Sequence, residues 1–135
     1  MDKRVYILDG AKFSSLEGFA RHFSEVVLED YQWSGNLDAL NDILWGGFGT
    51  PEGGFVLRWQ NSELSRRNLG TAETVRRLEA HLLICDPSGA PQMQRRLAEA
   101  KQGRGETLFD TIVEIIRDHG DGGRQSRSGV ELQLL

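Results

Sequence analysis

Two aspartates, Asp38 and Asp42, stand four residues apart within residues 31–57, a stretch that carries no lysine or arginine to neutralise them. On an α-helix, a spacing of four residues places two side chains on the same face, and Trp45 falls beside them. Carboxylates at this spacing repel each other by roughly 0.2–0.5 kcal/mol. Such a face is either an ordinary solvated helix surface or a site that binds cationic groups through charge-assisted hydrogen bonds.

A second acidic pattern lies near the end of the chain, where an acid recurs at every fourth position: Glu106, Asp110, Glu114 and Asp118. On a helix these residues would form one continuous stripe opposite an apolar side. Three successive like-charge contacts cost on the order of 1 kcal/mol together. Because that cost is small, the stripe alone does not distinguish a binding surface from a solvated face.

The aspartate pair is predicted to lie on a short helix at residues 37–45. Asn36 is a favourable N-cap, because its side-chain oxygen can accept a hydrogen bond from a backbone N–H of the first turn. Gly46 and Gly47 end the helix. The apolar residues of this helix recur at helical spacing and form one face: Leu37, Leu40, Ile43 and Leu44.

The rest of the chain alternates short β-rich runs with helical patterns. Strands are predicted at residues 4–8, 55–59 and 130–135, and helices at residues 16–28, 63–68, 71–83, 92–101 and 106–119. The second strand is apolar almost throughout, which favours a central, buried position. Strands separated by helices indicate an α/β fold with a small three-stranded parallel sheet packed with helices.

Length and composition describe one soluble globular domain of 135 residues, with 39% hydrophobic and 27% charged residues. Within it, residues 62–104 are predicted to form an enlarged helical section, and residues 120–129 a flexible linker before the last strand. No apolar run is long enough to span a membrane. The N-terminus lacks a secretory h-region and the chain has one cysteine, Cys85, so we expect a cytoplasmic protein without disulfides.

The net charge is −4, but the charge is unevenly distributed along the chain. Residues 1–57 carry a net charge of −5, residues 58–104 a net charge of +4 and residues 105–135 a net charge of −3. The two acidic sections would attract a cationic protein and repel nucleic acid, so direct RNA or DNA binding is not expected. Three Arg-Arg pairs punctuate the basic section, but they alternate with glutamates and are typical of an ion-paired surface.

The segment from Gly35 to Leu44 reads GNLDALNDIL and resembles the core motif of the barstar family of ribonuclease inhibitors. The resemblance extends to the order of the elements: an opening strand ending in VYILDG, a first helix, the strand FVLRW and a late acidic helix. It covers about two-thirds of the chain, and residues 62–104 are longer than in the namesake. It implies a barstar-like fold in which the helix at residues 37–45 and the late helix lie side by side.

The same resemblance implies a binding surface that both helices share. Asp38 and Asp42 match the family's two helix aspartates, with Asp42 as the deepest anchor, and Glu114 matches the glutamate of the late helix. The aromatic positions around the motif differ from the namesake, which indicates a different target enzyme. The residues expected to contact a partner are Trp33, Asn36, Asp38, Asn41, Asp42, Trp45, Glu114 and Asp118.

By this resemblance the chain is expected to be a non-catalytic inhibitor that uses no cofactor and no metal. Its carboxylates would stand in for RNA phosphates in the active site of a basic ribonuclease or nuclease toxin domain. The implied role is that of a bacterial immunity protein or antitoxin that is monomeric when free.

Two other functions are compatible with the sequence. A protein of this fold could be a binding module whose partner is not a nuclease, and the long basic middle section favours that alternative. Asp38, Asp42 and Glu114 could instead hold a divalent ion in a hydrolase. Against a hydrolase, the three histidines form no ligand pattern, and no Ser/His/Asp or Cys/His arrangement is recognisable.

Overall fold

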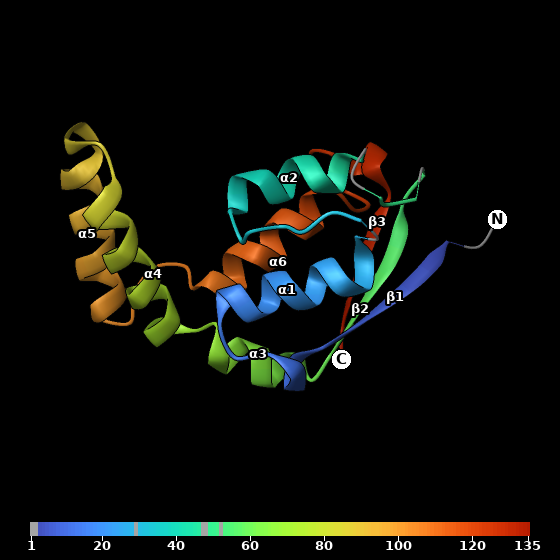
Figure 1. Cartoon of the computed structure of the whole chain (residues 1–135), viewed down its shortest axis with the longest axis horizontal. Coiled ribbons are helices and arrows are strands. Elements are labelled where there is room, and N and C mark those ends of the chain that lie inside the picture. Colours follow the sequence, from blue (N-terminus) through green and yellow to red (C-terminus); the bar gives the residue numbers. More distant parts are fainter. Residues whose placement is uncertain (1–2, 29, 47–48, 52) are drawn as a thin grey trace.

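The computed structural model describes residues 3–28, 30–46, 49–51 and 53–135, and the chain forms an α/β fold (Figure 1). Its strands and helices are, in chain order, β1 (Arg4–Asp9), α1 (Leu16–Val27), α2 (Leu37–Trp45), β2 (Phe55–Gln60), α3 (Ser62–Asn68), α4 (Thr71–Ile84), α5 (Ala90–Lys101), α6 (Leu108–Asp118) and β3 (Val130–Leu134). Short 3-10 helices are η1 (Gly10–Lys12), η2 (Pro87–Gly89) and η3 (Ser126–Ser128).

The three strands form one parallel sheet in the order β1-β2-β3. β2 is central, as its apolar sequence predicts, and pairs Leu57 with Tyr6 of β1 and Leu132 of β3. Side chains alternate between the two faces of a strand, so these three residues point to the same face. α1 and α6 pack on that face, and α2 packs beside α6 (Figure 1). The predicted α/β fold with a three-stranded parallel sheet is confirmed.

An aromatic cluster fills the core between the sheet and the helices. Trp59 of β2 stacks on Phe19 of α1 with ring centroids 5.1 Å apart, and it meets Phe109 of α6 at 5.2 Å. Trp59 Nε1–H donates to Ser65 Oγ of α3 at 2.9 Å, so the buried indole nitrogen is satisfied. These contacts hold α6 in a fixed position relative to the sheet.

The helix that carries the aspartate pair has the predicted bounds, Leu37–Trp45. Asn36 caps it, because Asn36 Oδ1 accepts from the backbone N–H of Asp38 at 2.9 Å and of Ala39 at 3.3 Å. Gly46 follows with a φ of 121°, in a region that favours glycine. Local chemistry therefore defines both ends of α2.

The starts of α3, α5 and α6 differ by one or two residues from their predicted positions at residues 63, 92 and 106. α6 begins at Leu108, because Thr107 and Asp110 form a capping box that leaves Glu106 outside the helix. The predicted stripe of four acids on one helix is therefore shorter than expected. α3 begins at Ser62, one residue before the predicted start.

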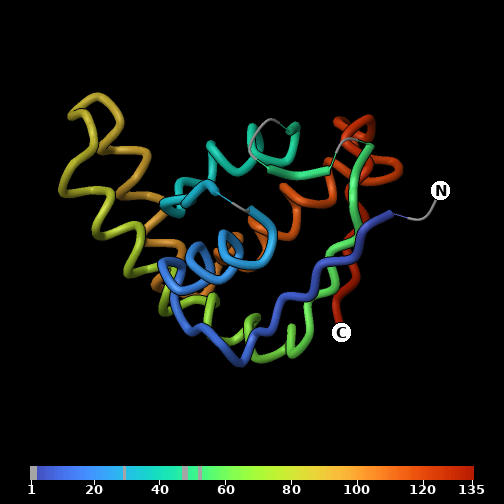
Figure 2. Tube along the Cα trace, turned by 45° about the vertical axis from the view of Figure 1, so that its right-hand side comes forward, coloured from blue at the N-terminus to red at the C-terminus, as the bar shows by residue number. Residues whose placement is uncertain are grey.

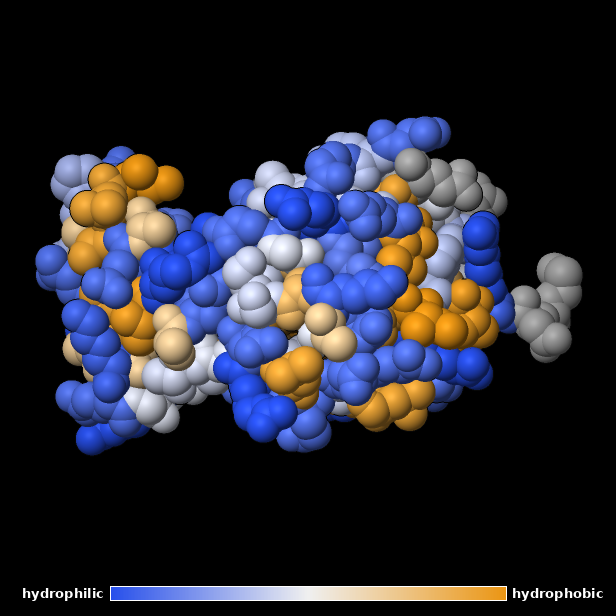
Figure 3. Space-filling view, turned by 60° about the horizontal axis from the view of Figure 1, so that its bottom comes forward, coloured by the Kyte–Doolittle hydropathy of each residue, from blue (hydrophilic) through white to orange (hydrophobic). Residues whose placement is uncertain are grey.

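The enlarged helical section includes a helical hairpin, α4 and α5, that projects away from the sheet (Figures 1 and 2). Val75, Leu78 and Leu82 follow the helical pattern that predicts a core-facing side, but they are only half-buried and lie outside the main core. The reason is that α4 packs mainly on α5. Leu83 and Ile84 at the outer end are 86% and 84% exposed, and Figure 3 shows hydrophobic residues on the surface of the projecting part.

Residues 120–129, the predicted linker before the last strand, form a packed turn in the structure. The backbone N–H of Gln125 donates to Asp118 O at 2.7 Å, and η3 follows. Gly129 meets Gly54 so closely that a Cβ on Gly54 would overlap the Gly129 carbonyl. Gly53 and Gly54, just before β2, therefore pack against Gly129, just before β3.

Candidate functional site

Helix α2 lies beside α6, and the two helices run in the same direction (Figure 1). Asn41 Oδ1, in the C-terminal half of α2, lies 2.8 Å from Nε2 of His119, the residue that follows α6. The ring of Trp45, at the end of α2, has its centroid 5.8 Å from that of His119. The C-terminal ends of both helices therefore meet. Each helix also carries two acids four residues apart: Asp38 and Asp42 on α2, Glu114 and Asp118 on α6.

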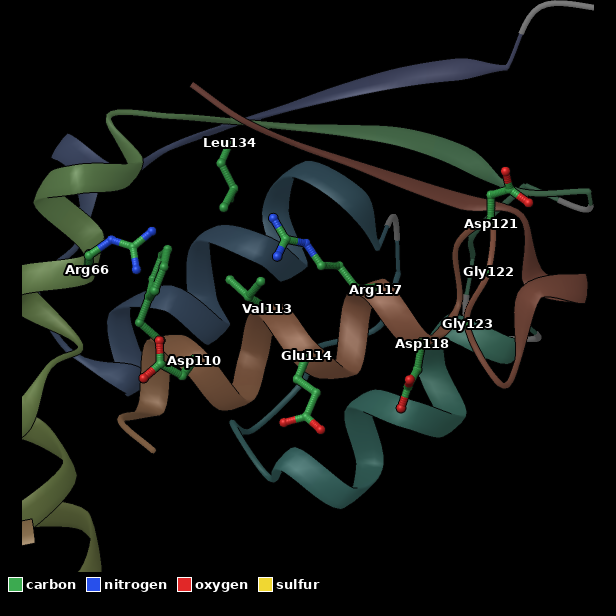
Figure 4. Close-up of a pocket in the computed structure, with 11 residues that line it drawn as sticks. Arg66, Asp110, Val113, Glu114, Arg117, Asp118, Asp121, Gly122, Gly123 and Leu134 are labelled. Carbon is green, nitrogen blue, oxygen red and sulfur yellow. The ribbon is translucent and has the colours of Figure 1, made fainter. Parts of the chain in front are cut away.

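We call these four acids the acidic surface. Asp38, Asp42 and Glu114 are exposed to solvent. Asp118 is half-buried, and its Oδ2 accepts from Arg124 Nη2 at 3.0 Å. In Figure 4 the side chains of Glu114 and Asp118 extend from α6 on the side where α2 lies. The acidic surface thus combines three solvent-exposed carboxylates with one, that of Asp118, which forms an ion pair with Arg124 of the same chain.

The carboxyl group of Glu114 stands among like charges. Its pKa is raised above the usual value of 4.5, first by a hydrogen bond and the charge of Glu106 and then by burial and the charge of Asp118. Arg124 acts in the opposite direction but does not offset the repulsion. A cation bound at Glu114 would favour the ionised carboxylate. The local electrostatics therefore favour an arginine or lysine side chain as the binding group.

A cavity of about 520 Å³ extends this surface along α6, toward α3 and β3 (Figure 4). Its apolar wall is made by Phe109, Val113 and Leu134. Its charged lining residues are four acids and two arginines: Asp110, Glu114, Asp118, Asp121, Arg66 and Arg117. Because acids outnumber arginines, the cavity continues the negative charge of the acidic surface onto the neighbouring side of α6.

A family model described as barstar, the barnase inhibitor, matches residues 3–82, which is more than half of the chain. The chain belongs to the barstar family. No curated protein matches the chain in a search by sequence.

The match to the barstar family ends within α4. It includes α2 with Asp38 and Asp42, but it does not include α6 with Glu114 and Asp118. The predicted membership of the barstar family is confirmed. The contact roles of the four acids stay predictions, and for Glu114 and Asp118 they depend on the packing of α6 beside α2.

One residue that the barstar resemblance placed in the contact surface, Trp33, is buried with only 1% of its surface exposed. Its Nε1–H donates to Asn36 O at 2.8 Å, and its backbone N–H donates to Ser24 Oγ at 2.9 Å. Its ring lies 5.8 Å from the rings of both Phe19 and Phe23. The prediction that Trp33 contacts a partner is therefore wrong, because the ring fills the core beside the start of α2.

The remaining candidates on α2 differ in what their side chains already bind. Trp45 is 50% exposed, so half of its surface lies in solvent. Asn36 is exposed, but its side chain caps α2. Asn41 is half-buried, and its Oδ1 accepts from His119 Nε2 and from Gln125 Nε2 at 2.9 Å. The oxygen of Asn41 therefore joins α2 to the rest of the protein.

The part of the chain that the structure describes contains no group of three or more His, Cys, Asp or Glu side chains placed to hold a metal ion. The hydrolase alternative thus has no metal-binding cluster among these residues. None of the described helices is long and apolar enough to cross a membrane.

Sequence reasoning did not identify His119, Gln125 or Asp121 as parts of this site. All three lie in or next to a glycine-rich segment whose composition is typical of a mobile loop. The placement of His119 and Gln125 depends on contacts with Asn41 of α2, about 80 residues earlier in the chain. No local pattern carries that information.

Proposed function

We propose that this chain inhibits a ribonuclease by inserting the acidic surface of α2 and α6 into the enzyme's active site. A ribonuclease concentrates arginine, lysine and histidine around the phosphate that it cleaves. Carboxylates held at fixed positions can bind the same cations through charge-assisted hydrogen bonds. Unlike RNA, a folded helix surface offers no bond for the enzyme to cleave.

The observation that carries this proposal is that α2 packs beside α6, with exposed carboxylates on both helices and a side-chain hydrogen bond across the pair. Asp38 and Asp42 come from α2 and Glu114 from α6, and Asn41 bonds to His119 across the helix pair. Because both helices are packed on one core, little conformational entropy is lost when a partner binds. The pKa of Glu114 is raised because the nearby acids outweigh Arg124, so a cation from a partner would stabilise its carboxylate.

The cations of the enzyme would divide between two adjoining regions. Asp38 and Asp42 would bind arginine side chains at the centre of the contact, where bidentate bonds give both strength and direction. Glu114 would bind a cation at the boundary with the cavity along α6. Trp45, half-exposed beside these acids, would pack against the enzyme and set its specificity.

This mechanism makes association depend on salt. A negative surface and a basic cleft attract each other over about 10 Å at 0.1 M ionic strength. We therefore expect the association rate constant to fall steeply as salt rises, with a smaller change in the dissociation rate constant. The same complementarity supports an immunity or antitoxin role, in which a monomeric, non-catalytic protein captures a nuclease inside the cell.

The test is inhibition of a panel of basic ribonucleases and nuclease toxin domains by wild-type protein, with Asp42→Ala and Glu114→Gln as variants. Glu79→Gln is the matched control, since Glu79 is exposed on the projecting hairpin. Truncating an anchor of this kind typically costs 2–5 kcal/mol of binding energy, or roughly 30- to 5,000-fold in Kd. If an enzyme is inhibited equally by all four proteins, the acidic surface is not the inhibitory site.

The projecting hairpin favours a second candidate, a barstar-family binding module whose partner is not a nuclease. Leu83 and Ile84 are almost fully exposed at its outer end, in a section longer than the family's namesake has. Purification from the native host, followed by identification of the bound protein, separates the two functions. A basic nuclease supports inhibition, and a partner without nuclease activity supports the binding module.

A further inference from the structure

His119 is fully buried and contacts three elements, two through its ring and one through its backbone carbonyl. Its Nε2 lies 2.8 Å from Asn41 Oδ1 of α2, and its Nδ1 lies 2.7 Å from Ser128 Oγ of η3. Its backbone carbonyl accepts from the N–H of Val130 at 2.9 Å, at the start of β3. The residue thus stands where α2, α6 and the packed turn at residues 120–129 meet.

The chemistry of these partners selects one form of the imidazole. Asn41 Oδ1 already accepts from Gln125 Nε2, and an amide oxygen can only accept, so His119 Nε2 must carry a hydrogen and donate. His119 Nδ1 is then the unprotonated nitrogen, and it accepts from the Ser128 hydroxyl. The neutral ring with its hydrogen on Nε2 therefore satisfies all three hydrogen bonds at once.

A proton added at Nδ1 would disturb this arrangement. Nε2 would still donate to Asn41, but Nδ1 would become a donor, so the Ser128 hydroxyl would have to turn its hydrogen away. The ring would also carry a positive charge in a fully buried position, and that cost favours a conformation in which the contact opens to water. From α2 the ring meets the Asn41 amide and the Trp45 ring, and from the turn it meets Ser128. The charge of Asp118 favours the proton, but burial has the larger effect and lowers the pKa of His119 below 6.5.

The position of the contact matters for the proposed inhibition. Near its start, α2 is attached to the core by Trp33 Nε1–H, which donates to Asn36 O. Its C-terminal half, which carries Asp42, is attached to α6 through Asn41 and His119. Ile43 and Leu44 also anchor this half in the core, so loss of the second attachment would loosen the position of Asp42 relative to Glu114 without unfolding α2.

We propose that His119 is a positioning residue for partner binding: its neutral ring holds the C-terminal half of α2 beside α6, and protonation of the ring releases it. This inference rests on the proposed function for its effect on binding, but the attachment itself concerns the free protein. Acidification then weakens binding of the partner by loosening the acidic surface.

Nuclear magnetic resonance of the free, full-length protein tests the attachment without any enzyme. At pH 7.5 the imidazole nitrogen shifts of His119 should report the Nε2–H tautomer. As pH falls, the opening constant of the amides at residues 41–45, which is their exchange rate divided by the intrinsic rate at that pH, should rise with the titration of His119. The rise should be about tenfold for each unit of pKa difference between the held and released states.

Two variants make the test specific. Asn41→Asp replaces the neutral acceptor with a carboxylate, which stabilises the protonated ring and should raise the titration midpoint of His119 by about 1–3 pH units. His81→Gln is the control, because His81 is exposed on the projecting hairpin, and it should leave both titration and exchange unchanged. An Nδ1–H tautomer in the wild type, or exchange at residues 41–45 that ignores the titration of His119, overturns the proposal.

Where an inhibited enzyme is in hand, the ratio of its inhibition constants at pH 6.0 and 7.5 adds a functional readout. His119→Gln keeps a donor toward Asn41 but cannot titrate, so its ratio should be closer to one than that of the wild type. An equal ratio in both proteins overturns the link to binding. Failure of Asp42→Ala to weaken inhibition would instead count against the proposed function and leave the resonance result standing.

Discussion

The carboxylate of Glu73 on α4 accepts a hydrogen bond from the backbone N–H of Leu16, 2.7 Å away, at the first residue of α1. Helix starts leave such N–H groups without partners inside the helix, so a side chain 57 residues away completes the start of α1. Thr74 does the same for α6, because its Oγ1 accepts from Leu108 N–H at 2.9 Å. The first turn of α4 thereby fixes the base of the hairpin to the helices that cover the sheet.

The first prediction follows from the charge on Glu73. Burial alone would raise the pKa of Glu73, but hydrogen bonds from Arg76 and from Leu16 N–H outweigh it, so the pKa lies below 4.5. Glu73→Ala should therefore lower the free energy of unfolding at pH 7 by about 1.5–3 kcal/mol, the usual value for a hydrogen bond to a charged group. Urea unfolding measures this difference.

The pH dependence of that loss has a definite sign. A lowered pKa stabilises the fold above pH 4.5, and this stabilisation disappears as pH falls through the folded-state pKa. The gap between wild type and Glu73→Ala should therefore shrink at pH 3.5. Glu79→Ala on the exposed side of α4 is the control. An undiminished gap at pH 3.5 would show that the carboxylate charge does not stabilise this contact.

The two tryptophans around α2 should respond differently to truncation. Trp33→Ala should cost about 3–5 kcal/mol of stability, because it empties a core site. Trp45→Ala should cost only about 1 kcal/mol, since half of its surface is already in solvent. Thermal unfolding compares them, and a larger loss for Trp45 would contradict the burial described for α2.

Much of the fold was predictable where local chemistry decides it. Asn36 and Gly46 mark the ends of α2 in the sequence, and the capping geometry agrees. The strand at Phe55–Gln60 reads as central because its residues are apolar almost throughout, and β2 does lie between β1 and β3. In both cases the deciding interactions lie within a few residues of each other.

The parts that could not be predicted depend on distant contacts. Trp33 and Trp45 are equally aromatic in the sequence, but only packing against Phe19 and Phe23 decides which one is buried. The hairpin leucines have a helical pattern that is satisfied by a neighbouring helix as well as by a core. Asn41 contacts His119, which is 78 residues later in the chain, and no local sequence pattern predicts that contact.

The outer end of the hairpin should tolerate polar residues. Leu83→Gln and Ile84→Gln should each change the free energy of unfolding by less than about 0.5 kcal/mol, because both side chains are already exposed. Leu69→Ala is the buried comparison, with 0% exposure and an expected loss of about 2–5 kcal/mol. A loss above 1 kcal/mol at either exposed position would mean that the hairpin packs on another part of the chain.

A further prediction concerns stability at mildly acidic pH. His22 Nε2 accepts from Asp9 N–H at 2.9 Å, and burial lowers the pKa of His22 below 6.5. Between the two pKa values, the histidine is protonated in the unfolded chain but neutral in the folded chain. The free energy of unfolding should therefore fall as pH drops below 6.5 toward the lower folded-state pKa. His22→Gln should reduce this slope by at most about 1.4 kcal/mol per pH unit, the limit for one proton.

Urea unfolding between pH 8.0 and 5.5 measures that slope. His81→Gln, at an exposed position, should reproduce the wild-type slope. A wild-type stability that rises on acidification over this range would mean that the buried histidines gain protons on folding, contrary to the hydrogen bond at Asp9.

The central claim, that the acidic surface occupies the place of RNA phosphate, is tested most directly by competition. The measurement is the apparent Kd of the protein for an inhibited ribonuclease at increasing concentrations of a 3′-mononucleotide, at constant ionic strength. Mutually exclusive binding predicts that the apparent Kd rises in proportion to the nucleotide concentration once its own Kd is exceeded. A ternary complex in which the apparent Kd stays constant would contradict the account, because the phosphate site would then be open while the inhibitor is bound.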